Sequence, residues 1–177
     1  MPGPLDLPAR RSLGGEFLES VAVALILAIL IRLFVLQPFY IPSGSMEPTL
    51  MPGDRIVVGK ADLFGQPKPG EVVVFHYPLD PRQDFVKRLI AVGGQTVQLR
   101  NSNLYINGKL VPEPYLPPGL TFADFGPVTV PAGTYFMLGD NRNNSDDSRV
   151  WGYVKKNLVV GRVLFIYWPL SRIGVVR

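Results

Sequence analysis

Cysteine is absent from this 177-residue chain, and His76 is its only histidine. The lack of cysteine excludes disulfide bonds, iron–sulfur clusters and thiolate zinc sites. One histidine without a neighbouring cluster of carboxylates also argues against a catalytic zinc site, so we expect neither a metal nor a cofactor. Charged residues make up only 18% of the chain, and the lysines and arginines form no dense run. A nucleic-acid partner is therefore not expected.

The most apolar stretch is VAVALILAILI at residues 21–31, which contains no polar side chain. Extended to residues 17–37, it suits a helix across the roughly 30 Å hydrocarbon core of a bilayer. A buried helix of a soluble protein rarely lacks a polar side. A cleaved secretory signal would need small residues after the run, but Leu36-Gln37-Pro38 is bulky. We expect a short cytoplasmic tail at residues 1–16, an uncleaved transmembrane signal anchor at 17–37 and a separate domain at 38–177.

The expected domain at 38–177 favours strands, because its β-branched and aromatic runs are bounded by proline and glycine. Strands are expected at residues 55–58, 71–77, 84–92, 96–100, 104–106, 109–111, 134–138 and 159–168. Asn107-Gly108 is typical of a tight hairpin turn. Residues 112–126, rich in proline and glycine, are expected to form a long surface loop. The pattern predicts a mainly β domain, either a sandwich or a partly open barrel.

Ser45 lies in PSGSMEPTL, a loop framed by glycine and proline shortly after the apolar run. A serine becomes a nucleophile only when a base removes its proton. His76 is one candidate base, although no Gly-x-Ser-x-Gly motif accompanies Ser45. His76 also fits an ordinary, half-buried position in a strand.

Lys87 is the second candidate base. In DFVKRLIAV, strand alternation places it on one face with Phe85 and Leu89. Desolvation on an apolar face lowers the pKa of a lysine, and a neutral lysine can serve as the base of a Ser–Lys pair. The alternative is that Lys87 reaches an edge of the sheet while Arg88 pairs with an acid.

A third segment, GDNRNNSDDSR at residues 139–149, is polar and lies between two apolar strands. A solvated loop would explain this composition. Alternatively, Ser145 hydrogen-bonds and orients a neutral lysine, while Asp147 and Arg149 pair to keep the loop rigid. This segment alone leaves both interpretations open.

PSGSMEPTL, DFVKRLIAVGG and LGDNRNNSDDSRVWGYV, in this order and spacing, resemble the bacterial type I signal peptidases. These are membrane-anchored serine proteases that remove signal peptides, and the resemblance covers roughly residues 17–168. It implies a Ser–Lys dyad of Ser45 and Lys87, with the Ser43 side chain and the Ser45 backbone N–H forming the oxyanion hole. It also implies that Ser145 orients the lysine and that the Asp147–Arg149 pair braces the site.

The resemblance implies pockets for small residues at positions −1 and −3 of the signal peptide, lined by Phe39, Ile41, Met46, Leu50, Phe85 and Val86. The expected partners are the signal peptides of secretory precursors and the lipid bilayer. The charges on the two sides of the anchor do not decide its orientation. The family places the catalytic domain on the extracytoplasmic side of the bacterial cytoplasmic membrane.

Two rival functions remain. A self-cleaving repressor-type protease shares the Ser–Lys chemistry but carries a DNA-binding helical domain, and the apolar run occupies that place here. A membrane-tethered β module that binds without cutting is the non-enzymatic alternative. Incubation with a precursor that has an Ala-x-Ala cleavage site distinguishes a peptidase from a binding module, because a binding module leaves the precursor intact.

Overall fold

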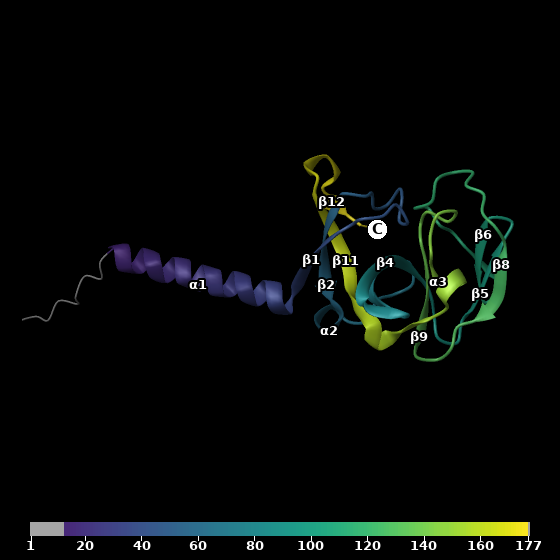
Figure 1. The fold of residues 1–177 in the computed structure, drawn as a ribbon, viewed down its shortest axis with the longest axis horizontal. Coiled ribbons are helices and arrows are strands. Elements are labelled where there is room, and N and C mark those ends of the chain that lie inside the picture. The colour runs from purple at the N-terminus through teal and green to yellow at the C-terminus, as the bar shows by residue number, and fades with distance from the viewer. Residues whose placement is uncertain (1–12, 177) are drawn as a thin grey trace, which may run out of the picture. The chain divides into compact units, whose positions relative to one another are not determined.

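The computed structural model describes residues 13–176 of a chain that divides into two compact units, one ending at Val35 and the other spanning Leu36–Arg177. The first unit contains helix α1, Leu13–Phe34 (Figure 1). Most of the tail expected at residues 1–16 lies outside the described residues. Among the residues that are described, no helix combines the length and the hydropathy required to span a membrane.

The second unit consists of two antiparallel sheets and confirms the expected mainly β domain. The smaller sheet (β5, β6, β8) lies at the opposite end of the unit from β1 and β2 (Figure 1). The larger sheet has the order β1 (Leu36–Tyr40), β2 (Arg55–Lys60), β11 (Val159–Trp168), β3 (Val72–Tyr77), β4 (Asp80–Val92), β9 (Thr134–Leu138) and β10 (Val154–Lys155), with β12 (Gly174–Val175) paired to β11. The smaller sheet has the order β7 (Lys109–Val111), β6 (Asn103–Ile106), β5 (Thr96–Arg100) and β8 (Phe125–Thr129). Short helices complete the unit: α2 (Ala61–Phe64), α3 (Ser148–Trp151), η1 (Lys156–Leu158) and η2 (Leu170–Arg172).

All eight expected strands are present, but two further strands of five residues were not expected. Strand β1 includes Leu36 and Gln37, so the helix expected to continue to residue 37 ends at Phe34. Strand β8 begins within residues 112–126, where only a surface loop was expected. Both strands contain a proline, which is depleted in strands, and both lie at the edge of a sheet, where a missing N–H donor is tolerated.

The central strand β3 is buried on both faces. Strand alternation directs Val72 and Val74 into one apolar cluster, and Val73 and Phe75 into another. The first cluster also receives apolar side chains from the segment around Ser45, namely Ile41, Met46 and Leu50. The Ser45 loop is therefore held to the sheet by its own buried hydrophobic residues.

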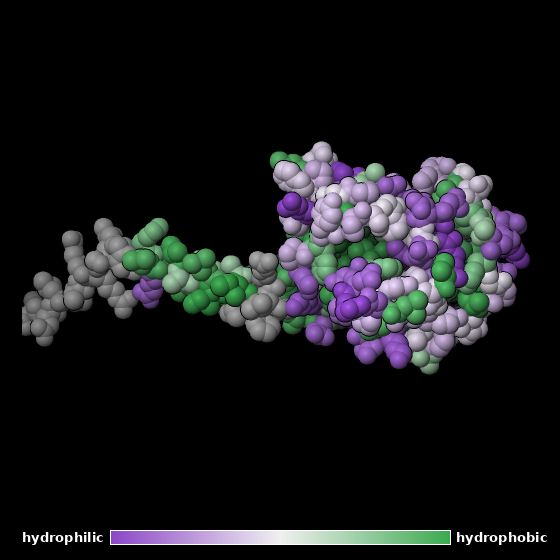
Figure 2. Space-filling model, in the orientation of Figure 1, coloured by the Kyte–Doolittle hydropathy of each residue, from purple (hydrophilic) through white to green (hydrophobic). Residues whose placement is uncertain are grey.

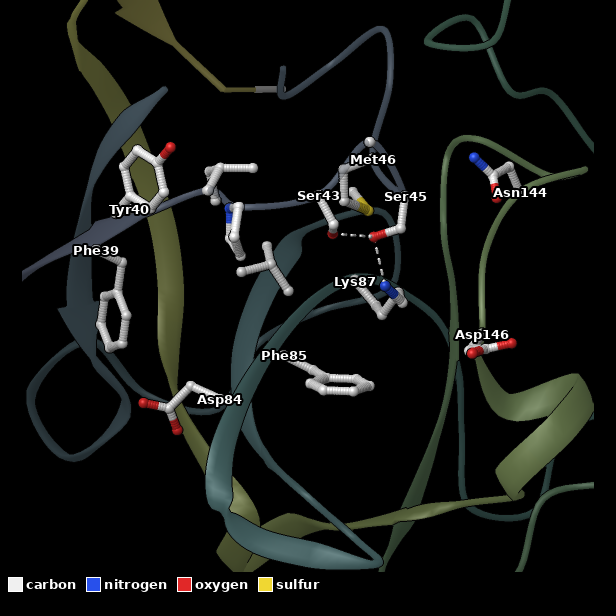
Figure 3. A pocket seen from close by; sticks show the side chains of 14 residues that line it. Phe39, Tyr40, Ser43, Ser45, Met46, Asp84, Phe85, Lys87, Asn144 and Asp146 are labelled. Atoms are coloured by element: carbon white, nitrogen blue, oxygen red, sulfur yellow. Dashed lines mark hydrogen bonds between the residues drawn. The ribbon is translucent and has the colours of Figure 1, made fainter. Parts of the chain in front are cut away.

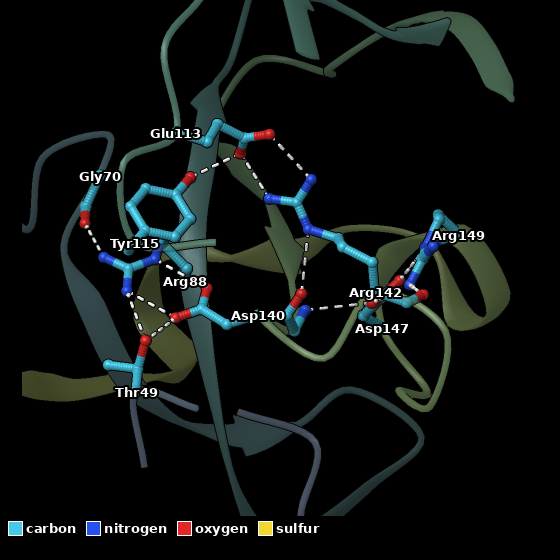
Figure 4. Close-up of polar contacts among 10 residues, drawn as sticks. Thr49, Gly70, Arg88, Glu113, Tyr115, Asp140, Arg142, Asp147 and Arg149 are labelled. Carbon is cyan, nitrogen blue, oxygen red and sulfur yellow. Dashed lines mark hydrogen bonds and ion pairs between the residues drawn. The ribbon is translucent and has the colours of Figure 1, made fainter. Parts of the chain in front are cut away.

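A buried ion pair joins three segments that are distant in sequence (Figure 4). Arg88 on β4 donates to Asp140 through Nε at 2.8 Å and through Nη2 at 2.6 Å, and neither side chain is exposed to solvent. Arg88 Nη1 donates to the Gly70 carbonyl at 2.6 Å. The Thr49 hydroxyl donates to Asp140 Oδ2 at 2.5 Å. Asp140 therefore ties the Ser45 loop to β4.

A second buried pair connects the segment 112–126 to the same region (Figure 4). Arg142 donates to both carboxylate oxygens of Glu113, and its Nε donates to the Gly139 carbonyl at 3.1 Å. The Tyr115 hydroxyl donates to Glu113 at 2.6 Å, and the Tyr115 ring lies 3.6 Å from the Arg88 guanidinium. Burial, more than the nearby Glu113 carboxylate, raises the pKa of Tyr115, so its hydroxyl stays a donor. Most of residues 112–124 form an irregular, exposed segment as expected, but Glu113 reaches the interior and Phe125 begins β8.

We expect Glu113→Ala to destabilise the β-rich unit by about 3–5 kcal/mol, because it leaves the fully buried Arg142 charge without its partner. Chemical denaturation of the full chain in detergent, followed by tryptophan fluorescence, measures this change. Asp80→Ala is the control, because Asp80 pairs with Arg82, whose side chain is 90% exposed, and its midpoint should stay near wild type. Equal midpoints for the two variants would contradict the importance of the Glu113 pair.

Candidate active site

A cleft of about 470 Å³ lies where the end of β1, the Ser45 loop, β4 and the loop 139–149 meet (Figure 3). Eight of the residues that the sequence assigns to the site line this cleft: Phe39, Ile41, Ser43, Ser45, Met46, Phe85, Val86 and Lys87. The remaining lining residues are Tyr40, Pro42, Gly44, Asp84, Asn144 and Asp146. The cleft therefore combines an apolar wall with a small set of hydroxyl, amine and carboxylate groups.

The side chains of Ser45 and Lys87, which are 42 positions apart in sequence, meet in this cleft. Lys87 Nζ donates to Ser45 Oγ at 2.6 Å, and Ser43 Oγ lies 3.5 Å from the same oxygen (Figure 3). Lys87 is only 4% exposed, so it does not reach solvent at an edge of the sheet. Its neighbour Arg88 is the residue that pairs with an acid, on the opposite face of β4.

Burial lowers the pKa of Lys87 to about 8, because the apolar surroundings disfavour the ammonium form. The carboxylates of Asp147, Asp146 and Asp140 oppose this effect and raise the pKa, but they do not cancel it. The Phe85 ring lies 5.6 Å from Lys87 Nζ and contributes to its burial. Roughly a tenth of Lys87 is therefore the neutral amine at pH 7 and about half at pH 8, and a neutral amine can accept the proton of the Ser45 hydroxyl.

The loop 139–149 fixes the backbone on both sides of the Gly44–Ser45 peptide. The Asn141 N–H donates to the Ser45 carbonyl at 3.1 Å, and Asn141 Nδ2 donates to the Gly44 carbonyl at 3.0 Å. A Cβ atom at Gly139 would collide with Ser145 Oγ and with the Ser45 carbonyl, so only glycine fits this approach. Nothing in the sequence singles out Asn141 beyond its place in a polar run between two apolar strands.

The predicted bracing pair is formed. Arg149 Nη2 donates to Asp147 Oδ2 at 2.7 Å, and its Nε donates to Oδ1 at 2.8 Å. Asp147 is fully buried and also accepts the Gly139 N–H at 3.1 Å. Arg149 further donates to the Arg142 carbonyl at 2.8 Å. These contacts hold the two ends of the loop together.

Two predicted site residues are placed differently. Ser145 Oγ is buried and has no hydrogen-bond partner within the described part of the chain, so the hydrogen bond expected between Ser145 and Lys87 is not formed. Leu50 is fully buried in the apolar cluster beneath the Ser45 loop and does not line the cleft. A hydrophobic residue close to a catalytic motif can belong to the core or line the pocket. Its spacing from the motif does not show which.

His76, the alternative base, is engaged elsewhere. Its Nδ1 lies 2.7 Å from Asp84 Oδ1 across the β3–β4 pair, and His76 is not among the residues lining the cleft. Among the described residues, His, Asp and Glu side chains form no group of three that could hold a metal ion. The position next to Ser45 Oγ that a base requires is occupied by Lys87.

Comparison with known proteins extends the similarity to most of the chain. Residues 15–168 match the family model described as signal peptidase, peptidase S26. The probable signal peptidase I-1 of Synechocystis sp. is 44% identical over 169 residues, covering 90% of this chain and 85% of that protein. Signal peptidase I of Mycobacterium tuberculosis is 39% identical over 228 residues, covering 96% of this chain and 78% of that protein. A crystal structure of a signal peptidase I from Enterococcus faecalis is 37% identical, with a TM-score of 0.49, and covers 55% of this chain and 96% of that one. On the family model and the curated relatives, the chain belongs to the signal peptidase family, peptidase S26.

Proposed function

We propose that this chain is a serine endopeptidase that removes N-terminal signal peptides from secretory precursors, with Ser45 as nucleophile and Lys87 as general base. The observation that carries this proposal is the 2.6 Å contact between Lys87 Nζ and Ser45 Oγ in an open cleft. Membership of the S26 family and the names of the curated relatives support the same reaction.

In the proposed mechanism, neutral Lys87 accepts the Ser45 hydroxyl proton while Oγ attacks the scissile carbonyl. The protonated lysine then gives this proton to the leaving amine, and a water activated by the same lysine hydrolyses the acyl-enzyme. The Ser45 backbone N–H has no hydrogen-bond partner within the described residues, so it is available to the oxyanion. The Ser43 hydroxyl, beside Ser45 Oγ, is the proposed second donor.

The apolar wall of the cleft is proposed to bind the small residues at −1 and −3 of the signal peptide. Phe39, Ile41 and Val86 line it together with Phe85 and Met46. Ile41 and Met46 are almost completely buried beneath the surface of the wall. Because such tightly packed side chains do not move aside readily, we propose that they limit the size of the side chain accepted beside Ser45, which favours alanine or glycine over a large or charged one.

The part of α1 from residue 17 to its end at Phe34 is proposed to anchor the chain in the cytoplasmic membrane, with the tail inside and the β-rich unit on the extracytoplasmic side. The described part of α1 exposes apolar side chains around its surface (Figure 2), among them Phe17, Leu18, Val23, Leu25 and Ile26. Such a surface is unfavourable in water and suits lipid. Anchoring enzyme and precursor in one bilayer raises their effective concentration and favours their encounter.

Ser45→Ala and Lys87→Ala should each reduce kcat/KM for a precursor with an Ala-x-Ala site by about 10⁴–10⁶-fold, because nucleophile and base act as one unit. The double variant should be little worse than either single one. Lys87→Arg should be as inactive as Lys87→Ala, because a guanidinium does not lose its proton. Purified protein in detergent and a gel-based cleavage assay measure these rates. Activity lost in His76→Ala but kept in Lys87→Ala would contradict the assignment.

The pH dependence of the wild-type rate follows from the Lys87 pKa. Protonated Lys87 cannot accept the serine proton, so kcat/KM should rise about tenfold per pH unit at low pH. The rise should level off near pH 8, because burial lowers the pKa of Lys87 to about 8. A profile of kcat/KM from acidic to alkaline pH checks this. A rise that continues to the ordinary lysine pKa of about 10.4 would show that the free site does not hold a depressed amine.

Precursors that differ only at position −1 test the pocket. Alanine or glycine should be cleaved, and phenylalanine or lysine should reduce kcat/KM by at least about 10²-fold, because the packed wall does not make room for a large ring and an apolar surface disfavours a charge. The reduction should appear for wild-type protein under conditions where all four precursors are equally soluble. Equal cleavage of the alanine and phenylalanine precursors would show that this wall does not select the residue at −1.

A further inference from the structure

Asp146 places an uncommitted negative charge in the cleft. It lines the cleft from the loop 139–149, and its side chain is exposed. In the part of the chain that the structure describes, its carboxylate makes no hydrogen bond or ion pair, although its charge acts on Lys87 and raises the pKa of that lysine. Asp84 is the other carboxylate that lines the cleft, and its Oδ1 lies at hydrogen-bonding distance, 2.7 Å, from His76 Nδ1. Of the two carboxylates, only Asp146 makes no hydrogen bond within the described residues, so its oxygens can contact a ligand.

The two carboxylates lie on opposite sides of the dyad. In Figure 3, Phe39, Tyr40 and Asp84 lie on one side of the Ser45–Lys87 contact, and Asn144 and Asp146 lie on the other. The position of Asp146 is well determined by its neighbour Asp147, which is buried and bound to the Gly139 N–H and to Arg149. The backbone that carries Asp146 is therefore held in place, on the side of the dyad opposite Phe39 and Tyr40.

A peptide cleaved at Ser45 must extend on both sides of Ser45 Oγ. If its acyl half lies against the apolar wall, as the proposed function requires, the residues after the cleaved bond pass Asn144 and Asp146. We propose that Asp146 selects the charge of the first residue after the cleaved bond, favouring basic and neutral side chains over acidic ones. This inference rests on the proposed function and concerns the leaving half of the substrate.

The expected size of the effect is modest, because Asp146 is exposed and water screens its charge. Exposed charge pairs typically change an equilibrium or a rate by a factor of up to about five. A precursor with lysine at +1 should therefore be cleaved with a kcat/KM about fivefold higher than one with glutamate. Salt should reduce this ratio, because the Debye length falls to about 3 Å at 1 M.

Three precursors test the inference, each with the same Ala-x-Ala site and with lysine, glutamine or glutamate at +1. The kcat/KM of full-length protein in detergent is measured for each at low and at high salt. Wild type should cleave them in the order lysine, glutamine, glutamate, with the differences shrinking at high salt. Asp146→Asn should bring the lysine-to-glutamate ratio close to one, and Asp146→Glu should retain it.

Asp84→Asn is the matched control, since it removes a carboxylate from the other side of the same cleft. It should leave the lysine-to-glutamate ratio at the wild-type value. A ratio unchanged in Asp146→Asn, or lost in Asp84→Asn, overturns the assignment while the cleavage itself upholds the proposed function. Failure of the wild type to cleave any of the three precursors overturns the proposed function, and this inference with it.

Discussion

The buried ion pair between Arg88 and Asp140 sets the geometry on which the site depends. An ion pair without solvent access is stable only when its hydrogen-bonding groups are satisfied, and here the partners are Asp140, the Gly70 carbonyl and the Tyr115 ring. Arg88 and Lys87 are consecutive on β4, so they point to opposite faces of the strand. If the pairing of β4 with its neighbours shifted by one residue, the Arg88 guanidinium would point into the cleft and the Lys87 amine would point toward Asp140. The ion pair thus fixes the register that brings Lys87 to Ser45.

Two opposing effects set the pKa of Lys87. Burial favours the neutral amine, whereas the negative charges of Asp147, Asp146 and Asp140 favour the ammonium. Asp147 and Asp140 are each engaged by an arginine, Arg149 and Arg88 respectively, which limits the net negative charge that reaches the amine. A base whose pKa is close to the working pH combines a useful neutral fraction with enough basicity to take a serine proton.

Local patterns in the sequence predicted the strands whose apolar residues alternate, and also the segments that carry Ser45 and Lys87. They did not predict β1 and β8, because each contains a proline, and a proline in a sequence argues against a strand unless the strand is known to lie at an edge. They also missed the pairs Thr49–Asp140 and Arg142–Glu113, whose partners are 91 and 29 positions apart. The residues next to a charged side chain in a polar loop do not indicate which distant residue it will pair with. The hydrogen bond between Ser145 and Lys87 is one interpretation of the polar segment and is also implied by the resemblance, but in the structure that hydroxyl is buried without a partner among the described residues.

The fold is claimed to lower the pKa of the Lys87 amine to about 8 before any substrate binds, so that part of it is neutral near neutral pH. NMR titration of protein labelled with ¹³C at the lysine ε-carbons measures this directly, with the Lys87 signal assigned by its absence from Lys87→Arg. The account predicts that this signal titrates with a pKa of about 8, while exposed lysines titrate near their ordinary value. A Lys87 signal that titrates near about 10.4, as in a solvated lysine, would contradict it.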